Sequence, residues 1–193
     1  MNLIGIAGTN GSGKDTLGQM LADKYGYLFI SVTDILRDEL RSRNLPLSRK
    51  YMRELSAEWR RESGLGVLVD RARLIFTQNA KDYRGLAISS LRNPGEADRV
   101  HEFGGKVVWL DATPEIRFER IQSNRAARGV HRSIDDNKTY EQFLADEQIE
   151  MHSTGDDTQL HGAAVKSKAD IFIENNGEHI ESFAEKVKAS LDL

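Results

Sequence analysis

The stretch Gly8-Thr9-Asn10-Gly11-Ser12-Gly13-Lys14-Asp15-Thr16 decides how this chain folds. It follows an apolar run, residues 3–7, of the kind that forms a buried strand in a parallel sheet. Apolar side chains then recur at helical spacing from Leu17 to Tyr25, which predicts that a helix begins within the stretch. The sequence therefore predicts a strand, a glycine-rich loop and a helix in immediate succession.

The loop matches the pattern G-x-x-x-x-G-K, and its place between a strand and a helix indicates a phosphate-binding loop, or P-loop. Glycines let backbone N–H groups turn inward around phosphate oxygens, and the helix N-terminus adds partial positive charge. Lys14 is expected to reach the β- and γ-phosphates of ATP. The alternative is a plain glycine-rich turn with a solvated Lys14, which the flanking strand and helix argue against. The residues expected to bind ATP are Gly8, Asn10, Gly11, Ser12, Gly13, Lys14, Asp15 and Thr16.

The residue after the P-loop lysine departs from the usual pattern. A Ser or Thr hydroxyl normally ligates Mg²⁺ at this position, but this chain has Asp15, followed by Thr16. A carboxylate can ligate Mg²⁺ as well as a hydroxyl, although it adds negative charge beside the phosphates. We therefore expect Asp15 and Thr16 to hold Mg²⁺, and we expect the departure to change how the metal is held without preventing nucleotide binding.

Length and composition fit one globular domain. The chain has 193 residues, of which 39% are hydrophobic and 30% charged, ordinary proportions for a soluble protein. A net charge of −3 argues against a general nucleic-acid binder, and the lack of cysteine excludes disulfides and cysteine-based sites. No apolar stretch has membrane-spanning length, and the first strand is predicted so early that we expect no signal peptide. We expect a cytoplasmic monomer or homodimer that binds small molecules, with no nucleic-acid or membrane partner.

Strand and helix patterns alternate along the whole chain. Strands are predicted at 3–7, 27–32, 86–90, 106–110 and 171–173. Helices are predicted from the P-loop onward, at about 34–43, 48–63, 67–76 and 94–103, from 114 onward, and at about 139–151, 159–165 and 180–191. Thr33 or Asp34 is expected to cap the helix after the second strand. The alternation predicts an α/β fold with a five-stranded parallel sheet and helices on both faces, in a single domain over 1–193.

Ligands bind at the carboxyl ends of the strands in an open parallel sheet, so the residues just past each strand are candidates for a site. Beyond the P-loop these are Thr33, Asp34, Ser89 to Arg92, Asp111, Asn175 and Asn176. Arg37 lies one helical turn after Asp34, and Arg92 lies directly beyond the third strand. Two arginines beside a triphosphate loop suit a second phosphate-bearing molecule, because guanidinium groups bind phosphate bidentately. The alternative is that Arg37 and Arg92 pair with neighbouring carboxylates on the surface.

Residues 117–132 are rich in arginine, and two interpretations are open. Charge runs are usually solvated helix faces without a further function. A mobile lid would instead bring Arg120 and Arg125 onto the transferring phosphoryl group, where positive charge lowers the barrier. The Gly129 region and the position after the fourth strand favour the lid, which we place at about 120–138.

Three further side-chain patterns bear on the site. The five histidines show no metal-ligand spacing. Trp59 and Trp109 are expected in the core rather than as stacking platforms. The turn Asn175-Asn176-Gly177 is expected beside the P-loop, so Asn175 is assigned to the nucleotide site, near the adenine.

Together these motifs resemble those of the P-loop nucleoside monophosphate kinase superfamily. The segment Thr33-Asp34-Ile35-Leu36-Arg37 is similar to the Gly-Asp-Leu-Leu-Arg segment of adenylate kinases, whose arginine binds the acceptor phosphate. Arg92 resembles the arginine after the third strand that does the same, and the run from Arg117 to Arg125 resembles the start of the lid. Residues 169–175 resemble the closing strand and turn of dephospho-CoA kinases.

Over most of the chain the resemblance is greatest to a group of mainly archaeal proteins of unassigned activity that are classed with both kinases. The shared segments are a Leu-Arg-x-x-x-Gly type motif, here Trp59-Arg60 to Gly64, and an acidic helix, here 143–147. On this resemblance Arg60 is assigned to acceptor binding. Two features depart from the family pattern. Ser89 replaces the aspartate of an Asp-Gly-x-Arg motif, and one extra residue separates Arg120 from the next arginine of the lid.

The sequence therefore predicts a kinase that moves the γ-phosphoryl group of ATP to a small phosphorylated acceptor, most simply a nucleoside or deoxynucleoside monophosphate. The catalytic residues are expected to be Lys14, Arg92, Arg120 and Arg125. A helical insertion at about 33–80 and the end of the third strand would bind the acceptor through Thr33, Asp34, Arg37, Arg60 and Arg92. Two alternatives are open: a dephospho-CoA kinase, in which a sugar hydroxyl attacks with the help of a base, and a nucleotide-binding switch or ATPase, which needs no acceptor site.

Overall fold

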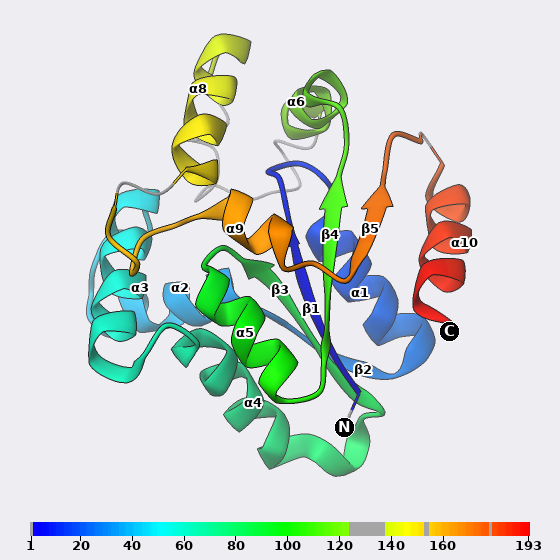
Figure 1. The fold of residues 1–193 in the computed structure, drawn as a ribbon, viewed down its shortest axis with the longest axis horizontal. Helices are drawn as coiled ribbons and strands as arrows, with labels where there is room; N and C mark the ends of the chain where they lie inside the picture. Colours follow the sequence, from blue (N-terminus) through cyan, green and yellow to red (C-terminus); the bar gives the residue numbers. More distant parts are fainter. Residues whose placement is uncertain (1, 124–137, 153–154, 178) are drawn as a thin grey trace.

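The computed structural model describes residues 2–123, 138–152, 155–177 and 179–193. At its centre lies a five-stranded sheet in the order β2-β3-β1-β4-β5, and every neighbouring pair of strands is parallel. The strands are β1 (Asn2–Gly8), β2 (Tyr27–Ser31), β3 (Gly85–Leu91), β4 (Lys106–Asp111) and β5 (Ile171–Glu174). The five-stranded parallel sheet that the sequence predicts is therefore confirmed (Figure 1).

Two apolar clusters, one on each face of the sheet, explain why the strands have continuous apolar sequences. Successive residues of β1 alternate between the clusters, since Leu3 packs into one and Ile4 into the other. The same alternation occurs on β3, where Ala87 and Ile88 belong to different clusters. All seven residues of β3 are buried, as expected for an inner strand of a parallel sheet that is covered on both faces.

Helices cover both faces of the sheet and the carboxyl ends of its strands (Figure 1). One face is covered by α1 (Lys14–Tyr25) and α10 (Ile180–Leu191). The other face is covered by α2 (Val32–Ser42), α3 (Arg49–Ser63), α4 (Val67–Asn79), α5 (Pro94–Glu102) and α9 (Gly162–Ser167), and a short 3-10 helix, η1 (Ala80–Asp82), follows α4. Of the other helices in the described part of the chain, α6 (Pro114–Ser123) and α8 (Tyr140–Met151) lie above the strand ends.

The helix after β2 begins earlier than the sequence predicts. Ser31 is its N-cap, so Thr33 and Asp34 lie within the first turn of α2 instead of capping it. The reason is packing: Val32 and Leu36, one helical turn apart, are both buried, and the apolar stripe of α2 therefore already includes Val32.

The helix predicted at about 159–165 is α9, and it begins only at Gly162. The side-chain amide of Asn93 donates to the carbonyl oxygens of Asp157, at 2.7 Å, and Gln159, at 2.9 Å. These two bonds hold the chain before α9 as a loop against the end of β3. The loop is thereby fixed close to the edge of the sheet where ligands are expected.

The carboxyl end of β3 carries a bulge. The pairing of β1 with β3 shifts by one residue between Ile6 and Ala7, which leaves Ser90 as the extra residue on β3. Ser90 has a φ of 70°, in the left-handed region that residues other than glycine rarely adopt. Bulges bend a strand and change the direction of the residues that follow, and the residue that follows here is Arg92, directly after the strand ends.

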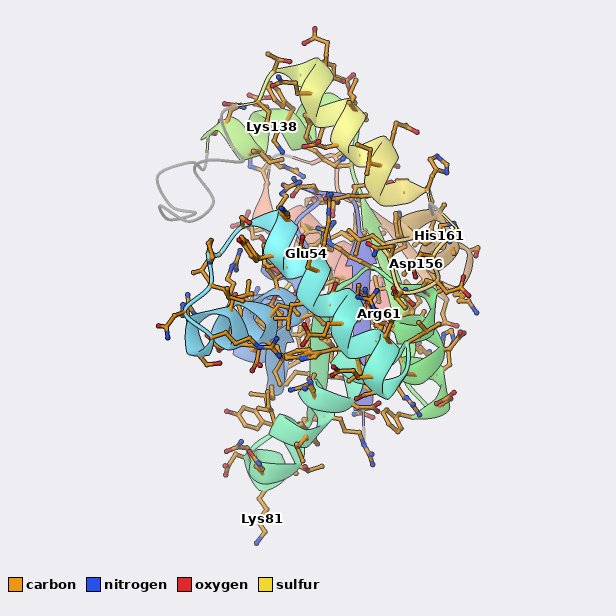
Figure 2. The ribbon with its side chains drawn as sticks, turned by 90° about the vertical axis from the view of Figure 1, so that its left-hand side faces the viewer. Glu54, Arg61, Lys81, Lys138, Asp156 and His161 are labelled. Atoms are coloured by element: carbon orange, nitrogen blue, oxygen red, sulfur yellow. The ribbon has the colours of Figure 1, made fainter. Side chains whose placement is uncertain are left out.

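Figure 2 shows the side of the molecule formed by α3, with Glu54 and Arg61 labelled on this helix. Lys81, on η1, projects at the end of the molecule far from α8. Among the helices that the structure describes, none is long and apolar enough to cross a bilayer.

Candidate nucleotide-binding site

The P-loop connects β1 to α1, and three of its glycines have backbone angles that favour glycine. The φ angles of Gly8, Gly11 and Gly13 are 139°, 82° and 100°. A Cβ atom on Gly8 would lie 1.9 Å from the carbonyl oxygen of Leu110 on β4, and one on Gly11 would lie 2.7 Å from the carbonyl oxygen of Arg117 on α6. The close approach of the loop to β4 and α6 therefore requires glycine at both positions.

Hydrogen bonds from the loop itself and from the ends of β4 and β5 hold the P-loop in place. The Ser12 hydroxyl donates to the Thr9 carbonyl oxygen at 2.9 Å, and the Thr9 hydroxyl donates to Asp111 Oδ1 at 2.6 Å. From the end of β5, Asn175 Nδ2 donates to the Ser12 carbonyl oxygen at 2.9 Å. The structure thus brings Asn175 against the P-loop, as the sequence suggests, through a contact with the loop backbone.

Lys14 is the first residue of α1, and its side chain is buried under the loop. The residue is 8% exposed, and Nζ donates to the Thr9 carbonyl oxygen at 2.5 Å. Burial lowers the pKa of Lys14 to about 7, and the positive charge of Arg92 lowers it in the same direction. An ammonium group in such surroundings is stabilised by an anion, so the loop and Lys14 fit the phosphates of a nucleotide.

Asp15, which departs from the usual P-loop pattern, is in contact with Ser89, which departs from the kinase family pattern. The Ser89 hydroxyl at the end of β3 donates to Asp15 Oδ1 at 3.0 Å. Ser31, the register partner of Ser89 on β2, has a buried hydroxyl that lacks a hydrogen-bond partner within the described ranges. Thr16 lies exposed in the first turn of α1.

These positions fit a magnesium ion that is held mainly by phosphate. No group of three or more His, Cys, Asp or Glu side chains within the described ranges could hold a metal by itself. Mg²⁺ at nucleotide sites usually needs only one or two protein ligands, because phosphate oxygens and waters complete its shell. A carboxylate at Asp15, next to Lys14 in the first turn of α1, meets this requirement.

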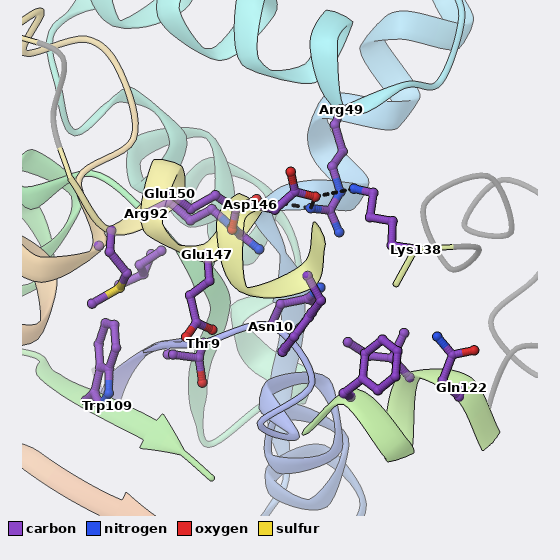
Figure 3. Close-up of a pocket in the computed structure, with 17 residues that line it drawn as sticks. Thr9, Asn10, Arg49, Arg92, Trp109, Gln122, Lys138, Asp146, Glu147 and Glu150 are labelled. Atoms are coloured by element: carbon purple, nitrogen blue, oxygen red, sulfur yellow. Dashed lines mark hydrogen bonds and ion pairs between the residues drawn. The ribbon is translucent and has the colours of Figure 1, made fainter. Parts of the chain in front are cut away.

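A cavity opens beside the P-loop at the carboxyl ends of β3 and β4 (Figure 3). The P-loop contributes Thr9 and Asn10 to its lining, β4 contributes Trp109, and Arg92 lines it directly after the end of β3. Its other walls come from α3, α6 and α8. Because ligands of open parallel sheets bind at this edge, the cavity is the candidate site for a molecule that reacts with the nucleotide.

Three arginines surround one carboxylate at this cavity. Arg92 forms an ion pair with Glu150 of α8, as do Arg49 and Arg53 of α3, with N–O distances of 3.2 Å for Arg49 and 3.5 Å for Arg53. Burial alone would raise the pKa of Glu150, but the charges of Arg92 and Arg49 outweigh it and lower the pKa to about 2. Of these four residues, the sequence singled out Arg92 alone.

A second ion pair connects α8 to the P-loop. Arg117 of α6 is 2% exposed, and its guanidinium group binds Glu147 of α8, with Nη2 2.9 Å from Oε1. The same group donates to the Asn10 carbonyl oxygen at 3.2 Å, from Nη1. Aromatic rings strengthen this junction, since the ring of Phe118 on α6 lies 5.6 Å from that of Phe143 on α8.

Arg120 lies at the end of the sheet but binds backbone. Its Nη1 donates to the Asn175 carbonyl oxygen at 2.8 Å, and its Nη2 donates to that of Gly177 at 2.7 Å. It therefore holds the turn after β5 in place. Arg125 and most of the predicted lid, residues 124–137, lie outside the described residues.

The predicted acceptor residues of α2 and α3 have partners within the protein. Arg37 pairs with Asp34 one turn away on α2, at 2.7 Å, and the Asp34 side chain is 62% exposed. In this structure Arg37 therefore binds a neighbouring carboxylate, which is the alternative to phosphate binding that the sequence left open. Thr33 is half-buried in the same first turn.

Arg60 does not have the position that the resemblance implies. Its side chain is 2% exposed, and Nη2 lies 2.7 Å from Oε1 of the fully buried Glu96 on α5. Nη1 donates to the Thr158 carbonyl oxygen at 2.7 Å. We reassign Arg60 to a structural role: together with Glu96 it fixes the chain around Arg92, whose N–H donates to Glu96 Oε2 at 2.7 Å.

The residues of the charged cluster that were not predicted from the sequence leave only a weak pattern in it. Arg49 and Arg53 are four residues apart, hence on one face of α3, and Glu147 and Glu150 are three apart on α8. Such spacing also describes an ordinary solvated helix face, so it could not identify the cluster without the packing.

Comparisons with known proteins bear on the family and the fold of this chain. Residues 4–143 match a family model described as an AAA domain. A UPF0200 protein of Pyrobaculum aerophilum is 26% identical over 100% of this chain and 99% of its own length. A UPF0200 protein of Thermococcus kodakarensis is 26% identical over 98% of this chain and 96% of its own length.

Among solved structures, a shikimate kinase from Bacteroides thetaiotaomicron has a TM-score of 0.60 at 19% identity, covering 99% of this chain and 98% of that one. A gluconokinase from Sinorhizobium meliloti has a TM-score of 0.51 at 16% identity, covering 99% and 91%. At such identities these likenesses establish the fold, which is that of the P-loop kinases. Because the family model spans the P-loop and most of the chain, this protein belongs to the AAA-domain family of P-loop NTPases and has the kinase-like form of the fold.

Proposed function

We propose that this protein is an ATP- and Mg²⁺-dependent kinase that transfers the γ-phosphoryl group to a small phosphorylated acceptor, most simply a nucleoside or deoxynucleoside monophosphate. One observation carries the proposal. The P-loop, with its buried Lys14, and a cluster of arginines that includes Arg92 line or adjoin the same cavity. A triphosphate site and an anion site that face each other at strand ends are the arrangement that phosphoryl transfer between two phosphate-bearing molecules requires.

The described residues divide the work of such a transfer. ATP, when bound, supplies the phosphoryl group, and Mg²⁺ neutralises its oxygens. Lys14 binds the β- and γ-phosphates, and Asp15 with Thr16 holds the metal. Arg92 holds the acceptor and contributes positive charge beside the transferring group. Arg120 positions the turn after β5, where the adenine would lie.

A hydroxyl acceptor is the second candidate, because the structural relatives include a shikimate kinase and a gluconokinase and because residues 169–175 resemble dephospho-CoA kinases. A hydroxyl needs a general base, whereas a phosphate acceptor is already anionic at neutral pH. Glu150 has a pKa of about 2 and is a poor proton acceptor, and Asp34 is exposed and paired with Arg37. These features favour the phosphate acceptor.

The test is a turnover panel of ATP and Mg²⁺ with each nucleoside and deoxynucleoside monophosphate, dephospho-CoA, shikimate, gluconate and water alone. We expect ADP release that depends on one class of monophosphate. Turnover with a hydroxyl acceptor and with no monophosphate would reject the proposal in favour of the second candidate. Hydrolysis that no acceptor accelerates would favour an ATPase or switch.

Variants of α2 distinguish the two acceptor classes further. With a monophosphate acceptor, Asp34→Asn is expected to lower turnover only modestly, and Arg37→Ala to raise the acceptor KM. A hydroxyl acceptor that used Asp34 as base would lose about 10²–10⁴-fold in rate with Asp34→Asn. Arg41→Ala is the matched control, because Arg41 pairs with Asp38 on the same helix with the same spacing, at 2.5 Å.

A further inference from the structure

A buried arginine in the first turn of α6 lies against the backbone of the P-loop. Nη1 of Arg117 donates to the Asn10 carbonyl oxygen at 3.2 Å. A Cβ atom on Gly11 would lie 2.7 Å from the Arg117 carbonyl oxygen, so the helix and the loop are in close contact. The Arg117 side chain is 2% exposed. It can therefore act on a bound phosphate only through the loop, not by touching it.

Contacts from three elements fix the guanidinium group of Arg117 in place. Directly after β4, the Ala112 carbonyl oxygen accepts from Nε at 2.8 Å. Glu147 of α8 binds both Nη atoms, and its Oε1 lies 2.9 Å from Nη2. Figure 3 shows Glu147 projecting from α8 toward the P-loop. The ring centroid of Phe143 lies 5.3 Å from the guanidinium carbon. Because a planar, rigid group is held in this way, its bond to Asn10 has a fixed direction.

The bond to Asn10 sets the orientation of one peptide of the loop. In a trans peptide the C=O and N–H groups point in opposite directions, so a carbonyl of Asn10 that faces Arg117 turns the N–H of Gly11 away from it. Asn175 holds the Ser12 carbonyl oxygen in the same manner, at 2.9 Å. Anion-binding loops act through such N–H groups. A charged donor on the carbonyl oxygen also polarises the peptide and makes its N–H a stronger donor.

We propose that Arg117 is a positioning residue of the nucleotide site: through the Asn10 carbonyl oxygen it directs the N–H of Gly11 toward the phosphates, and Glu147 holds it there. The inference rests on the proposed function in one respect, namely that the P-loop binds a nucleoside triphosphate. It adds to that function a part for α8, which lines the cavity and through Glu147 also supports the phosphate-binding loop. The competing explanation is that the ion pair serves only to attach α8.

The first measurement removes the pair without leaving a buried charge alone. The double variant Arg117→Met with Glu147→Leu replaces both side chains by apolar ones and keeps the net charge, a change that folded proteins often tolerate. A non-hydrolysable ATP analogue with Mg²⁺ is titrated by calorimetry at constant ionic strength. We expect the double variant to bind it about tenfold more weakly than the wild type does. Equal affinity in the two proteins would overturn the inference.

The second measurement reports on the Gly11 N–H itself and needs no variant. In ¹⁵N-labelled wild-type protein, the amide proton resonance of Gly11 should move downfield when the analogue binds, because this N–H then donates to a phosphate oxygen. In the double variant, saturated with the analogue, the displacement should be smaller. A wild type that binds the analogue while its Gly11 resonance stays in place would reject the role of Arg117, whether or not the double variant folds.

A matched control separates positioning from a general loss of stability. Arg60 is also buried, pairs with Glu96 and donates to the Thr158 carbonyl oxygen at 2.7 Å. Arg60→Met should lower the Tm, but well below that Tm it should keep the wild-type affinity for the analogue and the displacement of the Gly11 resonance. An equal loss of affinity in Arg60→Met would attribute the effect to stability and reject the inference. Failure of the wild type to bind the analogue would instead reject the nucleotide site and the proposed function.

Discussion

The P-loop and the arginine cluster lie on the same cavity but are built in opposite ways. The P-loop takes its shape mainly from local contacts, because Ser12 and Lys14 both donate to Thr9, three and five residues away, and bonds from the ends of β4 and β5 add to these. The cluster is made by pairs far apart in the chain, since Arg49 and Glu150 are 101 residues apart. A local loop keeps its shape through backbone angles, whereas a cluster of distant side chains depends on the packing of each element that carries them. The nucleotide end should therefore tolerate changes elsewhere, and the acceptor end should respond to them.

The largest expected effect comes from removing the charged group of the local structure. Lys14→Ala should reduce turnover to background and weaken ATP binding by about 1.5–3 kcal/mol, or roughly 10–100-fold, because a charge-assisted phosphate contact is lost. ATP titration and steady-state rates measure both effects. Lys81→Ala, at the far end of the molecule, should change neither (Figure 2). A folded Lys14→Ala protein with unchanged affinity and rate would show that the P-loop is not the nucleotide site.

The next effect tests the packing beneath the cluster. Arg60→Met leaves the fully buried Glu96 without its ion-pair partner, and we expect a loss of about 3–5 kcal/mol in the free energy of unfolding. Urea denaturation measures it. Arg61→Met is the matched control, because the neighbouring Arg61 is exposed and lies 3.9 Å from Asp156, a pair that contributes at most about 1 kcal/mol. Equal effects of the two substitutions would contradict the structural role of Arg60.

The same contrast explains what the sequence could and could not predict. The P-loop is recognisable because its glycines are needed at fixed local positions, and the strands because apolar runs such as 3–7 are buried on both faces. Both signals depend on near neighbours in the chain. The contact of Asp15 with Ser89 was also within reach, because both residues lie at positions that the fold places together.

The roles of individual arginines could not be predicted from the sequence. An arginine that lines a cavity and an arginine that is buried have the same local sequence signal. Arg60 was assigned to acceptor binding because its buried partner, Glu96, lies 36 residues away and gives no local signal. Arg49 and Arg53 acquire meaning only when α8 is packed beside α3, since Glu150 joins them. Long-range charge pairs have no periodicity, so only the packed structure reveals them.

A smaller effect is expected at the proposed Mg²⁺ site, where Asp15 after the P-loop lysine meets Ser89 at the end of β3. Asp15→Ser should raise the Mg²⁺ concentration for half-maximal turnover by about tenfold, because a carboxylate near the ion is lost. The exchange Asp15→Ser with Ser89→Asp should restore most of the wild-type value, since it returns a carboxylate to the other side of the same contact. Titrations of Mg²⁺ with both single variants and the double variant test this. An unaltered Mg²⁺ dependence in Asp15→Ser alone would refute the exchange.

The smallest expected effect is the uptake of a proton by Lys14 when ATP binds. In the free protein the pKa of Lys14 is about 7, because of burial and of the charge of Arg92. Phosphates raise this pKa, so at about pH 8 ATP binding should be accompanied by uptake of up to about one proton, and at about pH 6 Lys14 is protonated in both states and adds none. Calorimetry in buffers of different ionisation enthalpy measures the uptake. Equal proton uptake at the two pH values would contradict the lowered pKa.

The two tryptophans give this protein an optical signal that needs no label. Trp109 lines the cavity and donates from Nε1 to Asp111 Oδ2 at 3.3 Å, whereas Trp59 lies in the core, with the guanidinium carbon of Arg71 3.5 Å from its ring centroid. These are the two tryptophans of the chain, so Trp59→Phe leaves an emission that comes from the cavity wall alone. Indole fluorescence responds to nearby charge and to solvent. Rapid mixing of this variant with nucleotide, and then with candidate acceptors, would thus resolve in time which ligand enters first and how quickly each one leaves.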